Sequence, residues 1–104
     1  MTDRIEQLRR MLESDPTDPF CLYALGMEYA SSDHPEKAIA HLEQSLSMDE
    51  AQPWAWYHIA RCKLATGATN EAAQAIDTGL QVAHDAGDHS AVGDLEALRA
   101  QCDV

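Results

Sequence analysis

Two stretches of the chain carry the same pattern of apolar, small and polar positions, 34 residues apart. The first begins at Leu22 and the second at Trp56, and six of the seven compared positions agree in character. Such self-similarity is typical of a helical hairpin that must stack on a neighbouring copy to bury its apolar face. The pattern therefore predicts an all-α fold of stacked hairpins. The paired positions are Leu22 and Trp56, Leu25 and Ile59, Gly26 and Ala60, Tyr29 and Lys63, Ala38 and Ala72, Leu42 and Ile76, and Ser45 and Gly79.

Six antiparallel helices are predicted from the apolar spacing and from the turn residues between apolar segments. Asp18 followed by Pro19 indicates a helix start, because the carboxylate can accept from free backbone N–H groups and proline fits the first helical position. Pro35 and Pro53 open two further helices in the same way. Gly67 is expected to take a left-handed conformation after the fourth helix. The predicted helices cover about residues 3–13, 19–32, 35–48, 53–66, 70–84 and 89–102.

The first and last helices are expected to flank two complete hairpins. Asp3 and Glu6 have the spacing of a capping box at the start of the first helix. Projected back by one period, Leu8 falls in the slot of Leu42, so the chain is expected to begin on the second helix of an incomplete repeat. The last helix is predicted to cover the apolar face of the second hairpin. Its apolar positions are Ala91, Leu95, Leu98 and Cys102.

These residues resemble the tetratricopeptide repeat, whose first helix carries a Trp or Leu, then Leu-Gly, then Tyr. Leu25-Gly26 and Tyr29 carry the resemblance in the first copy, and Trp56 carries it in the second. The resemblance covers nearly the whole chain and implies a right-handed α-α superhelix in a single domain. The expected parts are a half-repeat helix at 3–13, repeats at 19–52 and 53–86, and a capping helix at 88–102.

Several aromatic and polar positions on the first helices are left over once the stacking slots are assigned. They recur three or four residues apart and so share a helix face, and the resemblance implies that this face lines a concave groove. Val92, Glu96 and Arg99 are expected along the far side of the groove. Aromatic rings and a guanidinium favour binding, because they offer a large contact area and a planar hydrogen-bond donor. The predicted groove residues are Phe20, Tyr23, Met27, Trp54, Tyr57, His58 and Arg61.

Some of these side chains have an alternative role. Phe20 and Trp54 can complete the core of so small a solenoid, whereas Tyr23, Tyr57 and Arg61 are expected to be accessible. An open aromatic groove can also be filled by another copy of the chain. Both alternatives stay open at the level of the sequence.

Composition and charge narrow the classes of partner. A chain of 104 residues fits one domain. It contains no apolar run long enough for a membrane span and no secretory signal pattern, so a cytoplasmic location is expected. The net charge of −11 would repel nucleic-acid phosphates and anionic lipid, so neither nucleic acid nor membrane is an expected partner. The acidic surface either keeps a small protein soluble or suits a halophilic, salt-rich cytoplasm.

No catalytic, metal-binding or cofactor motif stands out. The sequence lacks a glycine-rich phosphate loop, a nucleophile elbow and a His-Glu-x-x-His pattern. The cluster His84, Asp85, Asp88 and His89 lies at a helix junction and is expected to be a solvated turn, with a metal site as the alternative. The three cysteines form no close pair and are expected to be free thiols, with a redox switch as the alternative. They are Cys21, Cys62 and Cys102.

Two hypotheses for function follow. The first is a non-catalytic interaction module that binds a peptide segment of a partner protein in the aromatic groove. The alternative is a structural or assembly protein that forms a homodimer through the same groove or through a terminal helix. An enzyme is a third hypothesis, resting only on His58 near Arg61 and on the junction between His84 and His89, and neither catalysis nor a cofactor is expected.

Overall fold

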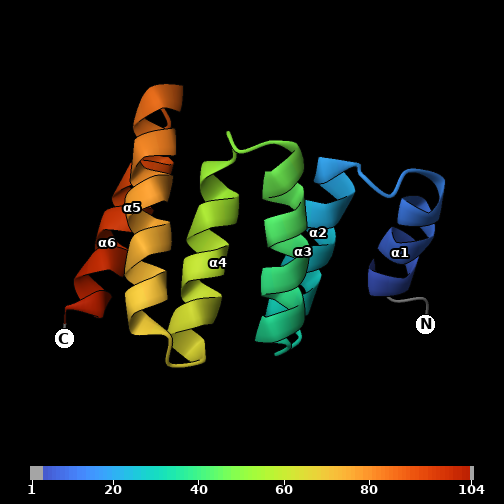
Figure 1. The fold of residues 1–104 in the computed structure, drawn as a ribbon, viewed down its shortest axis with the longest axis horizontal. Coiled ribbons are helices and arrows are strands. Elements are labelled where there is room, and N and C mark those ends of the chain that lie inside the picture. The colour runs from blue at the N-terminus through green and yellow to red at the C-terminus, as the bar shows by residue number, and fades with distance from the viewer. Residues whose placement is uncertain (1–3, 104) are drawn as a thin grey trace.

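The structure is a computed structural model that describes residues 4–103, and within this range it consists of six α-helices and no strand (Figure 1). The all-α prediction is therefore confirmed. The proposed cap at Asp3 lies outside the described residues. The helices are α1 (Arg4–Ser14), α2 (Pro19–Ser31), α3 (Pro35–Met48), α4 (Pro53–Ala65), α5 (Thr69–Ala86) and α6 (His89–Cys102).

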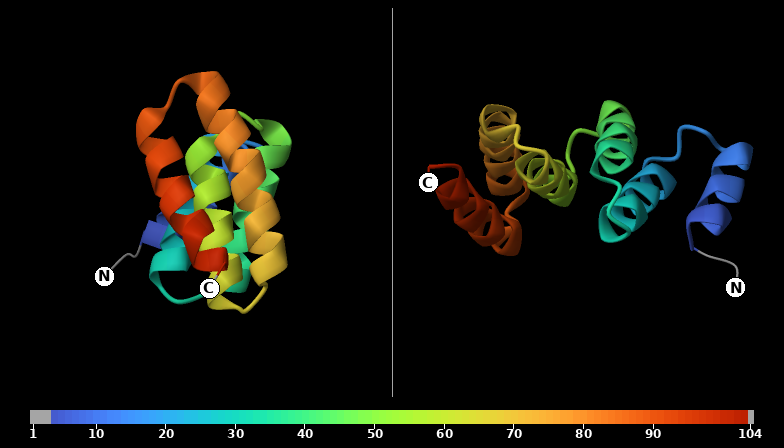
Figure 2. Two further views of the ribbon diagram at one scale, coloured as in Figure 1. Left: turned by 90° about the vertical axis from the view of Figure 1, so that its left-hand side faces the viewer. Right: turned by 90° about the horizontal axis from the view of Figure 1, so that it is seen from below.

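Each helix packs antiparallel against the next, which gives an elongated stack of 39 × 28 × 20 Å. In addition, α2 contacts α4 and α4 contacts α6. Seen along the helix axes, α2, α4 and α6 lie on one side of the stack, and α3 and α5 lie on the other (Figure 2). This two-layer arrangement is the α-α superhelix that the repeat pattern predicts, with hairpins α2–α3 and α4–α5 as the repeated units.

The helix ends follow the predicted capping chemistry. The Asp18 carboxylate accepts a hydrogen bond from the Phe20 backbone N–H at 3.0 Å, and Pro19 takes the first helical position. Gly67 and Gly87 both adopt left-handed backbone, with φ of 84° and 68°. The main difference from the prediction is α5, which begins one residue earlier and ends two residues later than expected.

Small residues allow the two helices of each hairpin to approach closely. A Cβ atom on Gly26 would lie 2.6 Å from Cγ of Leu42, and a Cβ on Gly79 would lie 2.8 Å from Cβ of Trp56. Both distances are too short for real contacts, so the positions of Gly26 and Gly79 accept only glycine at the present separation of their helices. The other small slots, Ala38, Ala60, Ala72 and Ser45, are fully buried.

A hydrogen-bonded cluster lies at one end of the helices, where the end of α3 leads into the start of α4. The Ser45 hydroxyl, which is fully buried, donates to the Pro19 carbonyl at 2.7 Å. The Gln52 side-chain amide donates to the same hydroxyl at 3.1 Å. The indole N–H of Trp56 donates to the Glu50 carbonyl at 3.2 Å. The start of α2, the end of α3 and the link to α4 are thereby tied together.

Among the seven compared positions, the one that differs in character is Tyr29 in the first repeat and Lys63 in the second, and Lys63 lines a hollow. Tyr29 is buried in the first hairpin, where its ring centroid lies 5.1 Å from that of His41. Lys63 takes the equivalent place in the second hairpin and stays half-buried. It lines a hollow of about 270 Å³ together with Glu43 and Glu71. An aromatic ring thus occupies the first hairpin at this slot, and a flexible lysine occupies the second.

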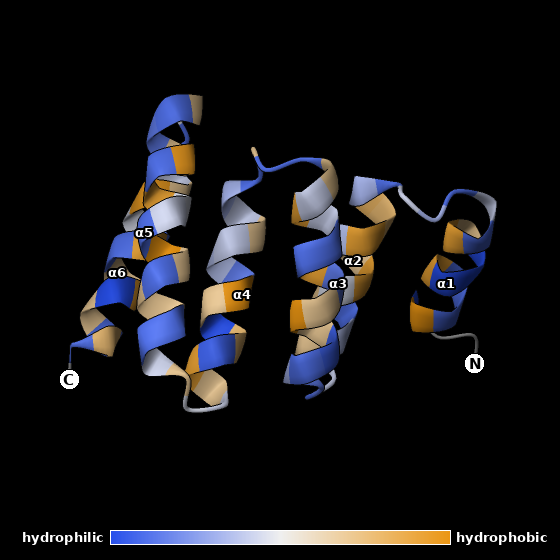
Figure 3. Ribbon diagram, in the orientation of Figure 1, coloured by the Kyte–Doolittle hydropathy of each residue, from blue (hydrophilic) through white to orange (hydrophobic). Residues whose placement is uncertain are grey.

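Apolar and polar residues are interspersed along the helices (Figure 3). The largest buried cluster joins α3, α4, α5 and α6, and a smaller one joins α1 and α2 with parts of α3 and α4. No helix within residues 4–103 is long and apolar enough to cross a membrane.

Candidate functional site

Four of the predicted groove residues form a continuous row of ring contacts on the side of the stack made by α2, α4 and α6. The Tyr23 ring centroid lies 6.4 Å from that of His58, His58 lies 5.0 Å from Tyr57, and Tyr57 lies 5.4 Å from Trp54. All three contacts are edge-to-face, a favourable geometry for aromatic pairs. We call these four residues the aromatic row.

Helix α4 supplies most of this surface because its aromatic residues are three or four positions apart. Trp54, Tyr57 and His58 are each half-buried, with Trp54 and Tyr57 packed against the main core cluster. Arg61 follows one turn later and is exposed, with its guanidinium carbon 5.8 Å from the Tyr57 ring centroid. The rings of Trp54 and Tyr57 are thus held by the core, and part of each ring remains accessible.

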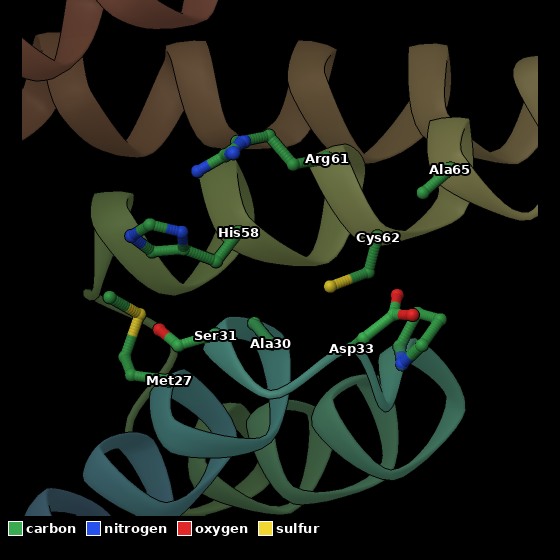
Figure 4. Close-up of a pocket in the computed structure, with 9 residues that line it drawn as sticks. Met27, Ala30, Ser31, Asp33, His58, Arg61, Cys62 and Ala65 are labelled. Atoms are coloured by element: carbon green, nitrogen blue, oxygen red, sulfur yellow. The ribbon is translucent and has the colours of Figure 1, made fainter.

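A pocket of about 190 Å³ lies between the C-terminal half of α2 and the facing side of α4. Figure 4 shows Met27 and Ala30 on α2 opposite His58 and Cys62 on α4, with Asp33 at one end. Asp33 has a φ of 64°, the only positive value outside glycine among the described residues. The full lining is Met27, Ala30, Ser31, Asp33, Pro35, His58, Arg61, Cys62 and Ala65.

A second hollow, of about 660 Å³, lies on the other side of α4, toward α6. Arg61 lines both spaces and so stands between them. Within residues 4–103, no carboxylate forms an ion pair with Arg61. Its charge is therefore not neutralised by a neighbouring carboxylate among the described residues. The second hollow is lined by Tyr57, Arg61, Leu64, Ala65, Leu98 and Gln101.

Burial favours the neutral forms of His58 and Tyr23. Burial lowers the pKa of His58 to about 4, and the nearby Arg61 cation acts in the same direction. Burial also raises the pKa of the Tyr23 hydroxyl. At neutral pH the aromatic row therefore presents a neutral imidazole and a neutral Tyr23 phenol, beside the Arg61 guanidinium and the Asp33 carboxylate that line the pocket. A neutral imidazole suits hydrogen bonding and apolar contact more than proton transfer.

The cysteine in the pocket has little nucleophilic character. Burial raises the pKa of the Cys62 thiol, Arg61 opposes this rise, and Glu36 adds to it. A thiol with a raised pKa is largely protonated at neutral pH, whereas the thiolate is the reactive form. The three cysteines are free, as expected, and Cys21 donates to the Asp18 carboxylate at 3.3 Å.

Met27 and Phe20, the two predicted groove residues on α2 outside the aromatic row, have different surroundings. Met27 lines the pocket on α2. Phe20 lies at the start of α2, is 66% exposed, and makes no ring contact with another aromatic residue in the part of the chain described. The alternative that Phe20 completes the core is therefore wrong. Trp54 does pack against the core, as the same alternative allowed.

The expected far side of the groove needs one correction. Arg99 points to α5, where its Nε donates to the Asp77 carboxylate at 3.2 Å, and it also donates to Asp103 at 3.0 Å. It is therefore engaged within the chain. Leu98 and Gln101 line the hollow on α6 in its place. The sequence signal for Cys62 was available, since it lies four residues after His58 on the same helix face.

The histidine-containing junction between α5 and α6 acts as a cap. The Asp88 carboxylate accepts from the Ala91 backbone N–H at 3.0 Å, which is the predicted role of a junction residue. Over the described range 4–103, no group of three or more His, Cys, Asp or Glu side chains is placed to hold a metal ion.

Comparison with protein families gives one match. A family model described as tetratricopeptide repeat matches residues 29–102. This range covers most of the first hairpin, all of the second, and α6. No curated protein matches the sequence significantly.

Solved structures of similar fold come from several sources. A protein from Bordetella parapertussis matches with a TM-score of 0.87 and 26% identity, covering 99% of this chain and 90% of its own. The TPR2B domain of yeast Sti1, in its pHsp70 complex, matches at 0.90 with 15% identity, covering 95% and 79%. PcrH, in complex with the chaperone-binding region of PopD, matches at 0.90 with 18% identity, covering 95% and 75%.

Proposed function

Since the chain belongs to the tetratricopeptide-repeat family, we propose that it is a non-catalytic module that binds a segment of another protein along the groove formed by α2, α4 and α6. The observation that carries this proposal is the aromatic row beside Arg61, which has no ion-pair partner among residues 4–103. Fold alone does not fix function, so the argument rests on this surface.

The residues of the groove have distinct roles in the proposal. Tyr23, Tyr57 and Trp54 are apolar anchors, because half-buried rings offer a large contact area with little side-chain entropy left to lose. Arg61 and His58 orient the ligand, the first as a planar cation and the second as a neutral hydrogen-bonding group. Met27 adds an adaptable apolar contact in the pocket, and Phe20 extends the surface at its outer edge.

Two structural neighbours support a protein ligand. The Sti1 domain is in a complex with pHsp70, and PcrH is in a complex with a region of PopD. By analogy, the groove of this chain takes an extended or helical segment of a partner. The net charge of −11 disfavours nucleic acid and anionic membranes as partners.

A peptide-display screen tests the proposal. Peptides selected on the wild-type chain are measured against a double variant, Tyr57→Ala with Arg61→Ala, by isothermal titration calorimetry. We expect the selected peptides to lose at least about tenfold in affinity, the size of effect seen when binding hot spots are truncated. Circular dichroism checks that helicity is unchanged.

A matched control uses the outer surface. The double variant Gln74→Ala with Thr78→Ala removes two exposed side chains of α5 that line the outer hollow. Its peptide affinity should equal that of the wild type. Equal affinity for the groove variant, or an equal loss in both variants, would exclude the groove as the binding site.

The alternative function is self-assembly through the groove. Phe20, exposed at the edge of the groove, is the feature that favours it. If copies associate in this way, Tyr57→Ala with Arg61→Ala would abolish association measured by light scattering, and the selected peptides would compete with it.

A further inference from the structure

Two charged side chains line the pocket between α2 and α4 without pairing with each other. Arg61 lies on α4 and Asp33 lies in the turn after α2, and both side chains are exposed. Within residues 4–103, neither forms an ion pair with the other or with a third group. A ligand in the pocket can therefore supply a group of opposite charge to each of them.

The two charges lie at opposite ends of the pocket. Figure 4 shows the Arg61 guanidinium on the side of His58, and the Asp33 carboxylate on the side of Cys62 and Ala65. His58 adds no charge to the first end at neutral pH, because burial and the Arg61 cation lower its pKa to about 4. The pocket therefore has a positive end and a negative end.

A second carboxylate strengthens the negative end. Glu36 lies in the first turn of α3, is exposed, and forms no ion pair among the described residues. Burial raises the pKa of the Cys62 thiol most, the Arg61 cation lowers it, and the Glu36 carboxylate raises it. The thiol therefore lies within reach of the charges at both ends.

The middle of the pocket is apolar and has room for one side chain. It lies between Met27 and Ala30 on α2 and Cys62 and Ala65 on α4. The flexible Met27 side chain can adapt to the shape of an apolar group. The volume of about 190 Å³ is below the range of about 300–1,000 Å³ that is usual for small-molecule sites. A single apolar side chain of a protein segment therefore suits this space.

We propose that the partner segment places an apolar side chain in this pocket, with an acidic residue at the Arg61 end and a basic residue at the Asp33 end. The inference rests on the proposed function, because it assumes that the groove binds a protein segment. It adds the charge pattern of that segment and its direction. The same segment lying in the opposite direction would bring like charges together at both ends, which disfavours binding.

The net charge of the chain fits this partner. A charge of −11 repels a strongly acidic segment at long range. A segment that carries both an acidic and a basic residue has little net charge and avoids this repulsion. Because Asp33 and Glu36 both lie toward the negative end, an additional basic residue there would also be accepted.

Peptide binding tests the charge pattern. Peptides are selected on the wild-type chain from a randomised display library, and their sequences should share an apolar residue flanked by an acidic and a basic one. In the tightest-binding peptide, the acidic residue and the basic residue are each replaced by Gln in turn. Calorimetry measures all three peptides against the wild type, Arg61→Gln and Asp33→Asn. Asparagine tolerates the left-handed backbone at position 33, where φ is 64°.

Each peptide charge should depend on one residue of the pocket. Loss of the acidic residue should weaken binding to the wild type and to Asp33→Asn by about threefold, the effect of an ion pair at an accessible site, and should not weaken binding to Arg61→Gln. Loss of the basic residue should weaken binding to the wild type and to Arg61→Gln by a similar factor. It should weaken binding to Asp33→Asn less, since only Glu36 then remains at that end.

The control variant is Glu71→Gln, which removes an exposed carboxylate from the outer side of α5. It should bind every peptide as the wild type does, and circular dichroism should show equal helicity for all variants. Selected peptides that require Tyr57 but lack the charge pattern, or that lose affinity equally against every variant, would overturn this inference and leave the proposed function standing. A library that yields no binder, or binders unaffected by Tyr57→Ala, would overturn both.

Discussion

Arg61 lies over the ring of Tyr57 and also acts electrostatically on His58. Its guanidinium carbon is 5.8 Å from the Tyr57 centroid, and the Tyr57 and His58 rings are 5.0 Å apart. The cation disfavours a second positive charge nearby, which adds to the effect of burial on the imidazole. One side chain thus sets both the charge of the groove and the protonation state of its histidine.

Replacing Arg61 by Gln is expected to raise the pKa of His58, because it removes the cation that disfavours the imidazolium. The pKa should stay below its usual value of 6.5, since burial is the larger cause. The His58 ring shifts in an NMR titration measure this directly. Arg9→Gln, on the exposed side of α1, is the control and should leave the His58 pKa unchanged.

Stability should depend on pH through His58. Its pKa is about 4 in the folded chain and near 6.5 when unfolded, so the unfolded chain binds more protons between these values. The contribution is fully present above about pH 6.5 and is lost as the pH falls toward 4. Allowing for the partial exposure of His58, we expect its contribution to the free energy of unfolding to be about 1–2 kcal/mol.

Urea unfolding at a series of pH values checks this expectation. The fall in free energy of unfolding between neutral and acidic pH should be smaller in His58→Gln than in the wild type. Identical pH profiles would contradict the lowered pKa.

The core should be sensitive to truncation at Leu42. Its side chain is fully buried between α2 and α3 and the second hairpin, so Leu42→Ala should cost about 2–5 kcal/mol of unfolding free energy. The neighbouring Glu43→Gln changes only an exposed side chain and should stay within about 0.5 kcal/mol of the wild type. Chemical denaturation of both variants provides the measurement.

Two glycines offer a matched test of close helix packing. At Gly79 a Cβ would lie 2.8 Å from Cβ of Trp56, so Gly79→Ala should destabilise the chain by about 1–3 kcal/mol. At Gly93 a Cβ would meet nothing, so Gly93→Ala should stabilise α6 by about 0.5–1 kcal/mol. Opposite shifts of the thermal midpoint are expected. Shifts of the same sign would contradict the close contact between α4 and α5 at Gly79.

Filling the hollow at Lys63 should stabilise the second hairpin. Lys63→Tyr restores the residue type that Tyr29 contributes to the first hairpin, and the space of about 270 Å³ accepts part of a ring. We expect a gain of about 0.5–2 kcal/mol in unfolding free energy. Lys63→Ala, which removes the charge without filling the space, separates the effect of packing from that of charge. An equal gain in both variants would mean that the ring adds nothing.

The helices and stacking slots could be predicted because they depend on local spacing. Apolar positions at helical intervals, prolines at helix starts, and Gly26 and Gly79 at close contacts each leave a direct signal in the sequence. The 34-residue period then fixes which helix meets which, without any long-range information. The tetratricopeptide resemblance is confirmed for the same reason.

The side-chain partners and the exposure of residues in the site cannot be predicted from helical spacing alone. Arg99 has the spacing of a groove residue, yet it pairs with Asp77, because a carboxylate on the neighbouring helix is within reach. Phe20 is a large apolar residue of the kind usually found in a core, but it stays exposed. It lies at the first turn of α2 and not in a stacking slot. The pocket beside His58 arises from the separation of two helices, which only coordinates give.

The hydrogen-bonded cluster at Ser45, Gln52 and Trp56 restricts movement between the hairpins at one end of the helices. In the described part of the chain, the side-chain hydrogen bonds that tie the first hairpin and its link to the start of the second lie at this end, at Ser45, Gln52 and Trp56. At the opposite end, near Asp33 and Ala65, the hairpins meet around the pocket. Because these hydrogen bonds hold the hairpins together at the Ser45 end, we expect a bulky ligand to separate the hairpins more at the Asp33 end.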